Sequence, residues 1–387
     1  MDYAQRTGHL KPEGAYQVLA KANQLEAAGK EIIHFEIGQP DFDTFPNVSM
    51  AGIRAITEGR TRYTSPSGMP SLQKLIAEDC GRRRGIHIES EEVVVGPGAK
   101  PALFFPTLAL VEAGDEVIYP DPGFPTYEAM IRVADGIPVA VPLLEENNFS
   151  FDLDVFDSLV NERTKLVILN SPSNPTGGVM PMADLEHIAE KAMEYDFWVM
   201  SDEIYARIAY DGLAVPSISS IPGMQARTII VDGFSKTYAM TGWRLGYGIM
   251  PRELADRVGL LLTHSIGSTA QFTQYAGAEA ILGQQEQVNA IVTEYQNRRD
   301  VIVAGLNAIP GIRCQKPQGA FYVFPNIRGT GMTSNELANL ILEKAGVALL
   351  PGSSFGGHGE GYLRLSYANS LANIEHGLER IQSILKK

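Results

Sequence analysis

Short apolar runs alternate with longer amphipathic stretches through the middle of the chain, and this alternation most restricts its possible folds. Such a pattern is typical of a mostly parallel sheet covered by helices. Strands are predicted at Val93–Val95, Glu116–Tyr119, Lys165–Leu169, Phe197–Ser201, Thr228–Val231 and Tyr247–Met250. Helices are predicted at Ser71–Arg83, Lys100–Val111, Met182–Tyr195 and Arg252–Leu262. We therefore expect an α/β fold that binds ligands at the carboxyl ends of its strands.

A second, smaller α/β domain is expected because the pattern changes near residue 283, and 387 residues exceed what one core usually organises. The predicted elements there are a helix at Gln284–Leu306, a strand at Gly319–Val323, a helix near Ser334–Ala345 and a C-terminal helix from Ser370. The segment IIHFEIGQPDF reads as a strand that runs into a crossing loop. We predict a large domain over 46–283 and a small domain from 1–45 and 284–387.

Composition excludes several classes of partner. The 45 acidic and 32 basic residues give a net charge of −13, which repels a nucleic-acid backbone. Only Cys80 and Cys314 are present, so a disulfide framework is disfavoured and a reducing cytoplasm is expected. No segment approaches the ~20 apolar residues of a membrane span, and the first residues lack the apolar stretch of a secretory signal. The seven histidines lack metal-ligand spacing, so no metal is expected.

The segment GFSKTYAMTGWRLG, Gly233 to Gly246, carries the most informative chemistry. Lys236 follows a predicted strand and is surrounded by small and apolar residues, which would lower its pKa and make it a nucleophile toward carbonyl groups. Arg244, eight residues later, could bind a phosphate through its planar guanidinium.

This segment matches the lysine-attachment motif of the class I and II aminotransferases, which depend on pyridoxal phosphate and have fold type I. The chain resembles this family over nearly its whole length, and its motifs are most similar to those of bacterial aspartate aminotransferases. The resemblance implies that Lys236 is catalytic and holds the cofactor as a Schiff base, while Arg244 binds its phosphate. Many relatives carry a phosphate-binding serine where this chain has Gly233, and Ser235 is expected to supply that hydroxyl.

Two further motifs follow predicted strands in the order of the family. The resemblance implies that Asp202, in SDEIY, pairs with the protonated ring nitrogen of the cofactor. Tyr205 and Asn174, the latter in NSPSNPTGG, would bond its phenolic oxygen. Asp202 could instead be a helix N-cap, and NSPSNPTGG by itself reads as a turn.

Three more segments complete the expected cofactor site. Gly98, Ala99 and Lys100, in GPGAKPAL, open a helix whose backbone N–H groups could hold the phosphate. Phe124, in DPGFPTY, would stack on the ring, although it could also be a simple core residue. In the family, the tyrosine matching Tyr63 reaches the cofactor phosphate of a partner subunit, which implies a homodimer with shared sites. A core position is the competing interpretation of Tyr63.

Other positions face the substrate in this resemblance. Arg364, in YLRLSYANS, would bind the substrate α-carboxylate with help from Asn174, and Gly38 would let that carboxylate approach the backbone. Lys100 matches the lysine that recognises the distal carboxylate in bacterial aspartate aminotransferases, which favours aspartate or glutamate.

One departure leaves this substrate choice open. Those enzymes have K-P-S-A-T in the N-terminal arm, whereas this chain has KPEGA, with Glu13 and Ala15 in place of the hydroxyl residues. Glu13 could pair with Lys100 and remove its charge from the pocket.

The predicted reaction is a ping-pong transamination from an L-amino acid to a 2-oxo acid, with 2-oxoglutarate as the expected acceptor. A carbon–sulfur β-lyase is the nearest alternative, because lyases of the same fold share most of these motifs. A non-catalytic regulatory protein on this fold is disfavoured, because the expected site residues are all present. We therefore expect a cytoplasmic transferase of amino acid metabolism.

Overall fold

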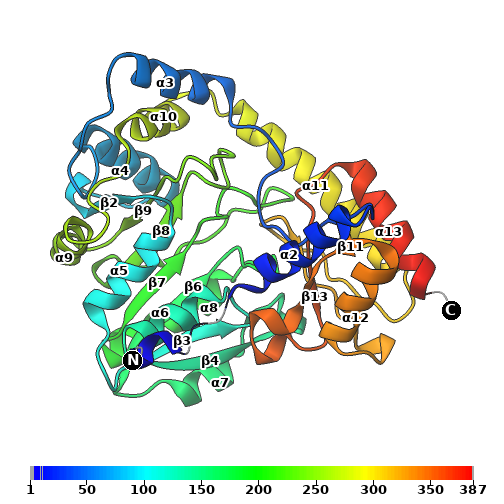
Figure 1. Cartoon of the computed structure of the whole chain (residues 1–387). Coiled ribbons are helices and arrows are strands. Elements are labelled where there is room, and N and C mark those ends of the chain that lie inside the picture. The colour runs from blue at the N-terminus through cyan, green and yellow to red at the C-terminus, as the bar shows by residue number, and fades with distance from the viewer. Residues whose placement is uncertain (1–3, 9, 11, 386–387) are drawn as a thin grey trace.

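A central sheet of eight strands organises the computed structural model, which describes residues 4–8, 10 and 12–385 (Figure 1). The strands lie in the order β2-β9-β8-β7-β6-β3-β4-β5. Their bounds are β2 (Val93–Gly96), β3 (Glu116–Asp121), β4 (Ile137–Leu144), β5 (Ser150–Phe151), β6 (Thr164–Asn170), β7 (Trp198–Asp202), β8 (Thr228–Gly233) and β9 (Gly246–Ile249). Strands β4, β3, β6, β7 and β8 are parallel, whereas β9 is antiparallel to β2 and β8, and β5 to β4. The predicted α/β fold is confirmed.

Helices cover both faces of this sheet, because its strands carry apolar side chains on both sides. In β8, Ile229 and Val231 pack into one core, and Ile230 packs into another. One face is covered by α5 (Lys100–Leu110), α6 (Thr126–Val133) and α9 (Arg252–Thr263). The other carries α7 (Leu153–Leu159), α8 (Met182–Tyr195), α4 (Pro70–Arg84), α10 (Gln271–Leu282) and, beyond α10, α3 (Pro46–Thr57).

All six predicted strands are present, each within two residues of its predicted ends, and the helix at Met182–Tyr195 has its predicted bounds. Strand β4 was not predicted, because Pro138 and Pro142 interrupt its pattern and proline is rare in inner strands. Strand β5 has only two residues, too few for a periodic signal.

Two small sheets lie beside the large one (Figure 1). In the first, β1 (Ile33–His34) pairs in parallel with β11 (Val347–Ala348), so the N-terminal segment joins the C-terminal part of the chain. In the second, β13 (Leu363–Ser366) lies between β10 (Tyr322–Val323) and β12 (Leu350–Pro351). The accompanying helices are α2 (Gly14–Ala27), α11 (Glu286–Asn307), α12 (Ser334–Leu340) and α13 (Leu371–Leu385). Helix α12 continues as a π-helical turn at Ile341–Ala345. A short helix, α1 (Gln5–Gly8), precedes them.

The small sheets and the large sheet meet at a shared apolar core. Phe321 and Tyr322 from the small side pack with Tyr205, which follows β7. Among the described residues, no helix is both long enough and apolar enough to cross a membrane.

Candidate active site

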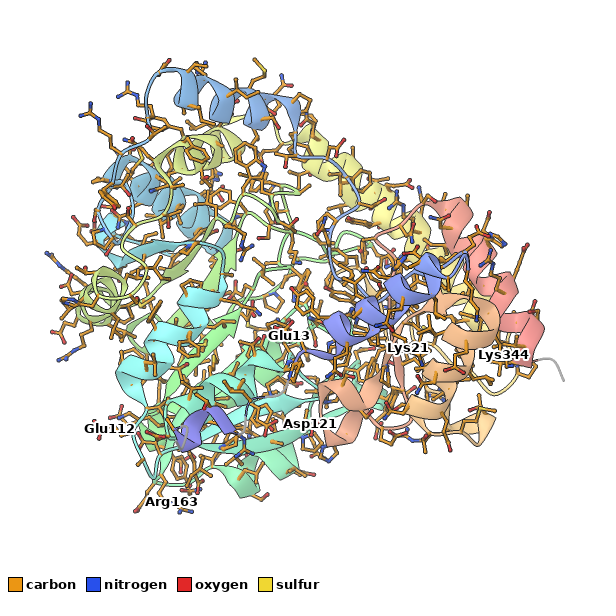
Figure 2. The ribbon with its side chains drawn as sticks, in the orientation of Figure 1. Glu13, Lys21, Glu112, Asp121, Arg163 and Lys344 are labelled. Carbon is orange, nitrogen blue, oxygen red and sulfur yellow. The ribbon has the colours of Figure 1, made fainter. Side chains whose placement is uncertain are left out.

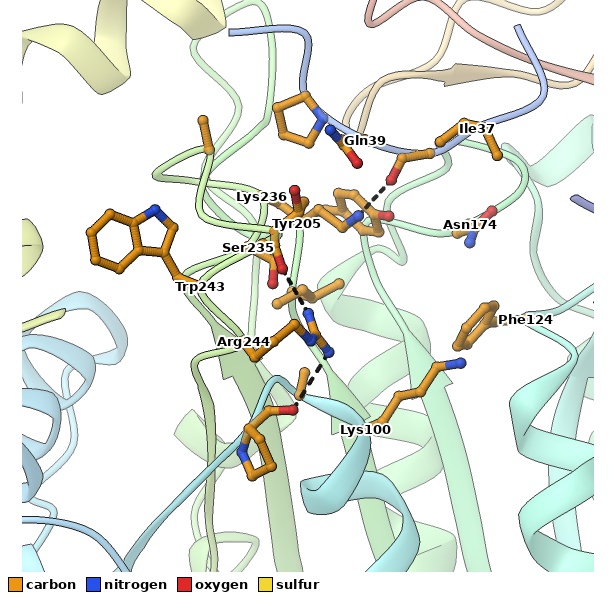
Figure 3. Close-up of a pocket in the computed structure, with 18 of the residues that line it drawn as sticks. Ile37, Gln39, Lys100, Phe124, Asn174, Tyr205, Ser235, Lys236, Trp243 and Arg244 are labelled. Carbon is orange, nitrogen blue, oxygen red and sulfur yellow. Dashed lines mark hydrogen bonds between the residues drawn. The ribbon is translucent and has the colours of Figure 1, made fainter. Parts of the chain in front are cut away.

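A cavity of about 1320 Å³ opens where the carboxyl ends of the parallel strands face the small sheets (Figure 3). From β3 the chain proceeds first to β4 on one side and later to β6 on the other, so the strand order reverses between β3 and β6. Such a reversal leaves a crevice in which α/β proteins bind ligands. Eleven predicted site residues line this cavity: Gly38, Ala99, Lys100, Phe124, Asn174, Asp202, Tyr205, Ser235, Lys236, Arg244 and Arg364. The sequence motifs therefore converge on one place.

Lys236 projects into this cavity from the turn after β8. Its Nζ donates a 2.6 Å hydrogen bond to the carbonyl oxygen of Gly38 and lies 5.8 Å from the centre of the Tyr205 ring (Figure 3). Burial, together with the positive charges of Arg364 and Arg244, lowers the pKa of Lys236 to about 8. The amine is therefore neutral, and nucleophilic, in a much larger fraction of molecules than an exposed lysine would be at neutral pH.

Asp202 ends β7 beneath the cavity and is buried. Its Oδ2 accepts a 2.8 Å hydrogen bond from the hydroxyl of Tyr127, and its Oδ1 accepts one of 3.2 Å from the backbone N–H of Ile204. Burial raises the pKa of Asp202 to about 6 despite these two donors. Because Ile204 follows in a turn, the interpretation of Asp202 as a helix N-cap is wrong. A positively charged ligand group would stabilise this carboxylate.

The amino end of α5 and the side chain of Arg244 meet at one corner of the cavity. Gly98 has φ +89°, and a Cβ there would collide with the guanidinium of Arg244. A Cβ on Gly246 would overlap the backbone of Gly98 and Ala99, so glycine is required at both positions. The Arg244 guanidinium donates to the carbonyl oxygens of Thr241 (2.9 Å) and Pro97 (3.4 Å), which hold it against the start of the helix. Gly98 shapes this corner without lining the cavity.

Arg364 lies buried on β13, across the cavity from α5. Its guanidinium donates to Oδ1 of Asn174 at 3.3 Å and to the carbonyl oxygen of Glu36, and its Nε has no partner among the described residues. The guanidinium also lies 4.6 Å from the centre of the Tyr322 ring. Burial lowers the pKa of Arg364. A buried cation with neutral partners and a free donor is suited to an incoming carboxylate.

Tyr322 explains the glycine at position 38. A Cβ on Gly38 would collide with the Tyr322 hydroxyl, which lies 2.7 Å from the hydroxyl of Tyr205. The small residue therefore lets the N-terminal segment lie directly against two tyrosines that line the cavity.

Lys100 pairs with Glu13 at the cavity rim, with 2.5 Å between Nζ and Oε1. This is the contact that the KPEGA segment led us to consider, although Lys11 of that segment lies outside the described residues. Nζ of Lys100 is 5.4 Å from the centre of the Phe124 ring. Phe124 is only half-buried and lines the cavity, so it is not a simple core residue.

Tyr63 is the predicted site residue that lies apart. Its exposed fraction is 95%, and it does not line the cavity of its own chain. The interpretation of Tyr63 as a core tyrosine is therefore wrong.

Comparison with known proteins identifies the family. The sequence model of the family called aminotransferase class I and II matches residues 30–381 of this chain. The chain belongs to this family. An aspartate aminotransferase from Pyrococcus horikoshii is 39% identical, over 99% of this chain and 97% of that protein. The crystal structure of an aromatic aminotransferase from Pyrococcus horikoshii OT3 is 39% identical with a TM-score of 0.90, covering 95% of this chain and 98% of that chain. The crystal structure of an aspartate aminotransferase from Rhizobium meliloti has a TM-score of 0.96 at 34% identity, covering 100% of this chain and 99% of that chain.

Membership of the class I and II aminotransferases confirms the predicted family and enzyme class. Because these similar proteins are named aminotransferases, the β-lyase alternative is not favoured, and neither is a non-catalytic regulator.

Tyr127 and Tyr322, which contact Asp202 and Arg364 in this cavity, were not predicted from the sequence. Tyr127 lies within the DPGFPTY segment, and Tyr322 within GAFYVF. The available signal was a tyrosine in an apolar segment, whose hydroxyl needs a partner when buried.

Proposed function

We propose that this aminotransferase transfers an amino group from an L-amino acid to a 2-oxo acid, with pyridoxal phosphate as its cofactor. In the proposed ping-pong cycle, the first amino acid leaves as its oxo acid before the second oxo acid enters. The observation that carries this proposal is the Lys236 amine, which shares one cavity with a buried carboxylate, Asp202, and a buried guanidinium, Arg364. A neutral amine in one cavity with these two groups suits an aldehyde cofactor and an amino acid substrate.

The residues present fit pyridoxal phosphate. The corner between Arg244 and the start of α5 suits a phosphate, and Ser235 lines the cavity beside it. Asp202 would face the protonated ring nitrogen, and the Lys236 amine would hold the cofactor covalently as a Schiff base. Tyr205 would donate to the phenolic oxygen of the ring. When bound, pyridoxal phosphate supplies an aldehyde that accepts amino groups and a ring that withdraws electrons from the substrate α-carbon.

Each protein group then has a defined task. Arg364 would bind the substrate α-carboxylate through two N–H donors, which fixes the direction of the α-carbon–hydrogen bond. Lys236, once its amine is free, would remove the α-proton and hold it at Nζ until it is returned. Asn174 would keep the Arg364 guanidinium in place through their existing hydrogen bond. Phe124, on one wall of the cavity, would stack on the cofactor ring.

A homodimer with shared active sites is part of the proposal. A tyrosine with a 95% exposed side chain is unusual unless another molecule covers it, and Tyr63 is in addition the residue that the family motif directs toward a partner. Apolar side chains of α3, namely Met50, Ile53 and Ile56, are exposed as well. Such a surface is suited to a second copy of the chain.

Two further points of the proposal rest on the sequence. We propose a large domain over 46–283 and a small domain from 1–45 and 284–387, which agrees with the pairing of β1 and β11. We also propose a cytoplasmic location, in keeping with two free, buried cysteines.

The substrate class is best tested by mixing the purified, cofactor-loaded enzyme with single amino acids and following its absorbance. An amino acid that acts as donor changes the spectrum without an oxo acid, and a 2-oxo acid, either 2-oxoglutarate or one with an uncharged side chain, should restore it. Lys100 makes aspartate and glutamate candidates, and some similar proteins are named for aspartate. An enzyme that shows no spectral change with any amino acid would not be an aminotransferase of this kind.

A further inference from the structure

We propose that Glu13 acts as a built-in replacement for the distal carboxylate of an acidic substrate. Because its carboxylate pairs with the ammonium group of Lys100, the cavity favours amino acids with uncharged side chains. This inference rests on the proposed transamination at the same site, and it assigns a selecting role to a residue outside the catalytic machinery.

The side chain of Glu13 is directed to Lys100 and not to the helix that it precedes. Glu13 is the N-cap residue of α2, but its side chain makes no capping hydrogen bond. Its carboxylate instead approaches Nζ of Lys100 at 2.5 Å, and Figure 2 shows Glu13 at the start of α2. Because Lys100 lies at the start of α5, this ion pair joins the N-terminal arm to the wall of the cavity.

The charge of Glu13 also reaches the far side of the cavity. Burial lowers the pKa of Arg364, and the negative charge of Glu13 is among the influences that raise it. A substrate whose α-carboxylate binds Arg364, and whose second carboxylate approaches Lys100, would therefore come close to Glu13. Like charges brought together in a partly desolvated pocket repel each other, so a dicarboxylate has to displace Glu13 or accept this cost.

The cavity wall near Glu13 offers apolar surface in place of a free cation. Ala15, Tyr16 and Leu19 of α2, the helix that Glu13 precedes, line the cavity, and so does Ile37. Figure 3 shows Ile37 on the wall of the cavity near Asn174. These side chains suit an aliphatic or aromatic substrate.

The arm that carries Glu13 is fixed by close packing. A Cβ on Gly14 would lie 2.6 Å from Oγ of Ser354, so the backbone of the arm lies directly against that loop. Ala15 and Val18 pack against the apolar cluster formed by Phe149, Phe324, Leu350, Phe355 and Tyr362. Glu13 is therefore held at the rim by its neighbours and not by its charge alone.

The test compares Glu13→Gln with the parent enzyme, and Glu26→Gln is the matched control. Glu26 lies on the same helix and the control changes the net charge equally, but Glu26 does not line the cavity. Isothermal titration of the cofactor-loaded enzyme with glutarate and pentanoate measures binding without reaction. These two acids have the same carbon chain and differ in the second carboxylate. Glu13→Gln should shift the ratio of their dissociation constants toward glutarate by about tenfold, and Glu26→Gln should not.

An unchanged ratio in Glu13→Gln, or an equal gain for both acids, would overturn the proposal. The double variant Glu13→Gln/Lys100→Gln should lose the gain, because Lys100 is the cation that the freed carboxylate uses. A gain that persists without Lys100 would also overturn it.

Turnover separates this inference from the proposed function. The ratio of kcat/KM for aspartate to that for leucine should rise in Glu13→Gln. The parent enzyme could convert amino acids while both ratios stay unchanged in Glu13→Gln. That result would refute the role of Glu13 and leave the proposed function intact. A titration ratio that shifts as expected in an enzyme with no transaminase activity would support Glu13 and refute the proposed function.

Discussion

Tyr127 donates a 2.8 Å hydrogen bond to Oδ2 of Asp202, at the buried end of β7. This contact supplies a donor but no positive charge to a carboxylate whose pKa burial has raised to about 6. In the protein alone, the ionised form of Asp202 is therefore costly, and a cationic group in the cavity would relieve that cost.

The first prediction concerns this cost. The Asp202 pKa is higher in the folded chain than its ordinary value of 3.8, so ionisation destabilises the fold increasingly as pH rises from about 4 to about 6. Asp202→Asn should make the cofactor-free protein about 1–3 kcal/mol more stable at pH 8, with less difference at pH 4. Urea unfolding at the two pH values measures this difference in stability.

The same variant, loaded with cofactor, should lose at least about 10²-fold in kcat. A variant that is less stable at pH 8 and fully active would contradict the assignment of Asp202.

The second prediction concerns the pKa of Lys236, which burial lowers to about 8. Because the neutral amine is the reactive form, modification of Lys236 in the cofactor-free protein by an aldehyde and a reductant should rise between pH 7 and 9 and then level off. Exposed lysines should continue to gain reactivity toward their ordinary pKa of about 10.4. Peptide mapping by mass spectrometry distinguishes them. Equal profiles for Lys236 and surface lysines would show that the amine is not desolvated.

The third prediction removes the Lys236 amine. Lys236→Ala should abolish transamination and covalent attachment, because the proposed proton carrier and attachment point are lost together; a loss above about 10⁴-fold is expected. Cofactor absorbance and mass under reducing conditions measure the attachment. Noncovalent binding of the cofactor at the corner between Arg244 and the start of α5 should survive. Normal turnover by the variant would refute the role of Lys236.

The fourth prediction separates substrates by their α-carboxylate. Arg364→Ala should reduce kcat/KM for amino acids by about 10²-fold or more, because a buried charge-assisted contact is lost. Simple amines, which lack the carboxylate, should lose far less. Steady-state kinetics with a matched pair, such as leucine and isopentylamine, tests this. Equal losses for the two would remove Arg364 from carboxylate binding.

The fifth prediction concerns Tyr63 and the proposed dimer. Tyr63→Phe should leave the unfolding free energy within about 0.5 kcal/mol, because the side chain is 95% exposed in its own chain. It should nevertheless weaken cofactor binding, since the hydroxyl is proposed to reach the phosphate of the partner subunit. Equilibrium dialysis measures this affinity. If the parent protein sediments as a monomer in analytical ultracentrifugation, the shared site is refuted.

The sequence was sufficient to predict six of the eight strands of the large sheet and eleven of the residues that line the cavity. Strands such as β7 and β8 are continuous apolar runs that end in polar residues, and Asp202 and Lys236 stand at those ends. The carboxyl edge of a parallel sheet brings such residues together without any knowledge of loop conformations.

The contacts between the large and small parts could not be predicted in the same way. Tyr322 and Tyr205 are separated by more than a hundred residues, and their hydroxyl contact depends on how β10 packs on the turn after β7. The clash that requires Gly38 follows from this same packing. Tyr127 was missed because its position beneath Asp202 depends on how α6 crosses the sheet.

Helix α2 packs on β11 and β12, and β12 is paired directly with the strand that carries Arg364. Glu13, which is proposed to select among substrate side chains, therefore lies in the same packed layer as Arg364, which is proposed to bind the α-carboxylate. Any movement of that layer relative to the large sheet would move both residues together. The choice of substrate side chain and the binding of the α-carboxylate would then occur in one step.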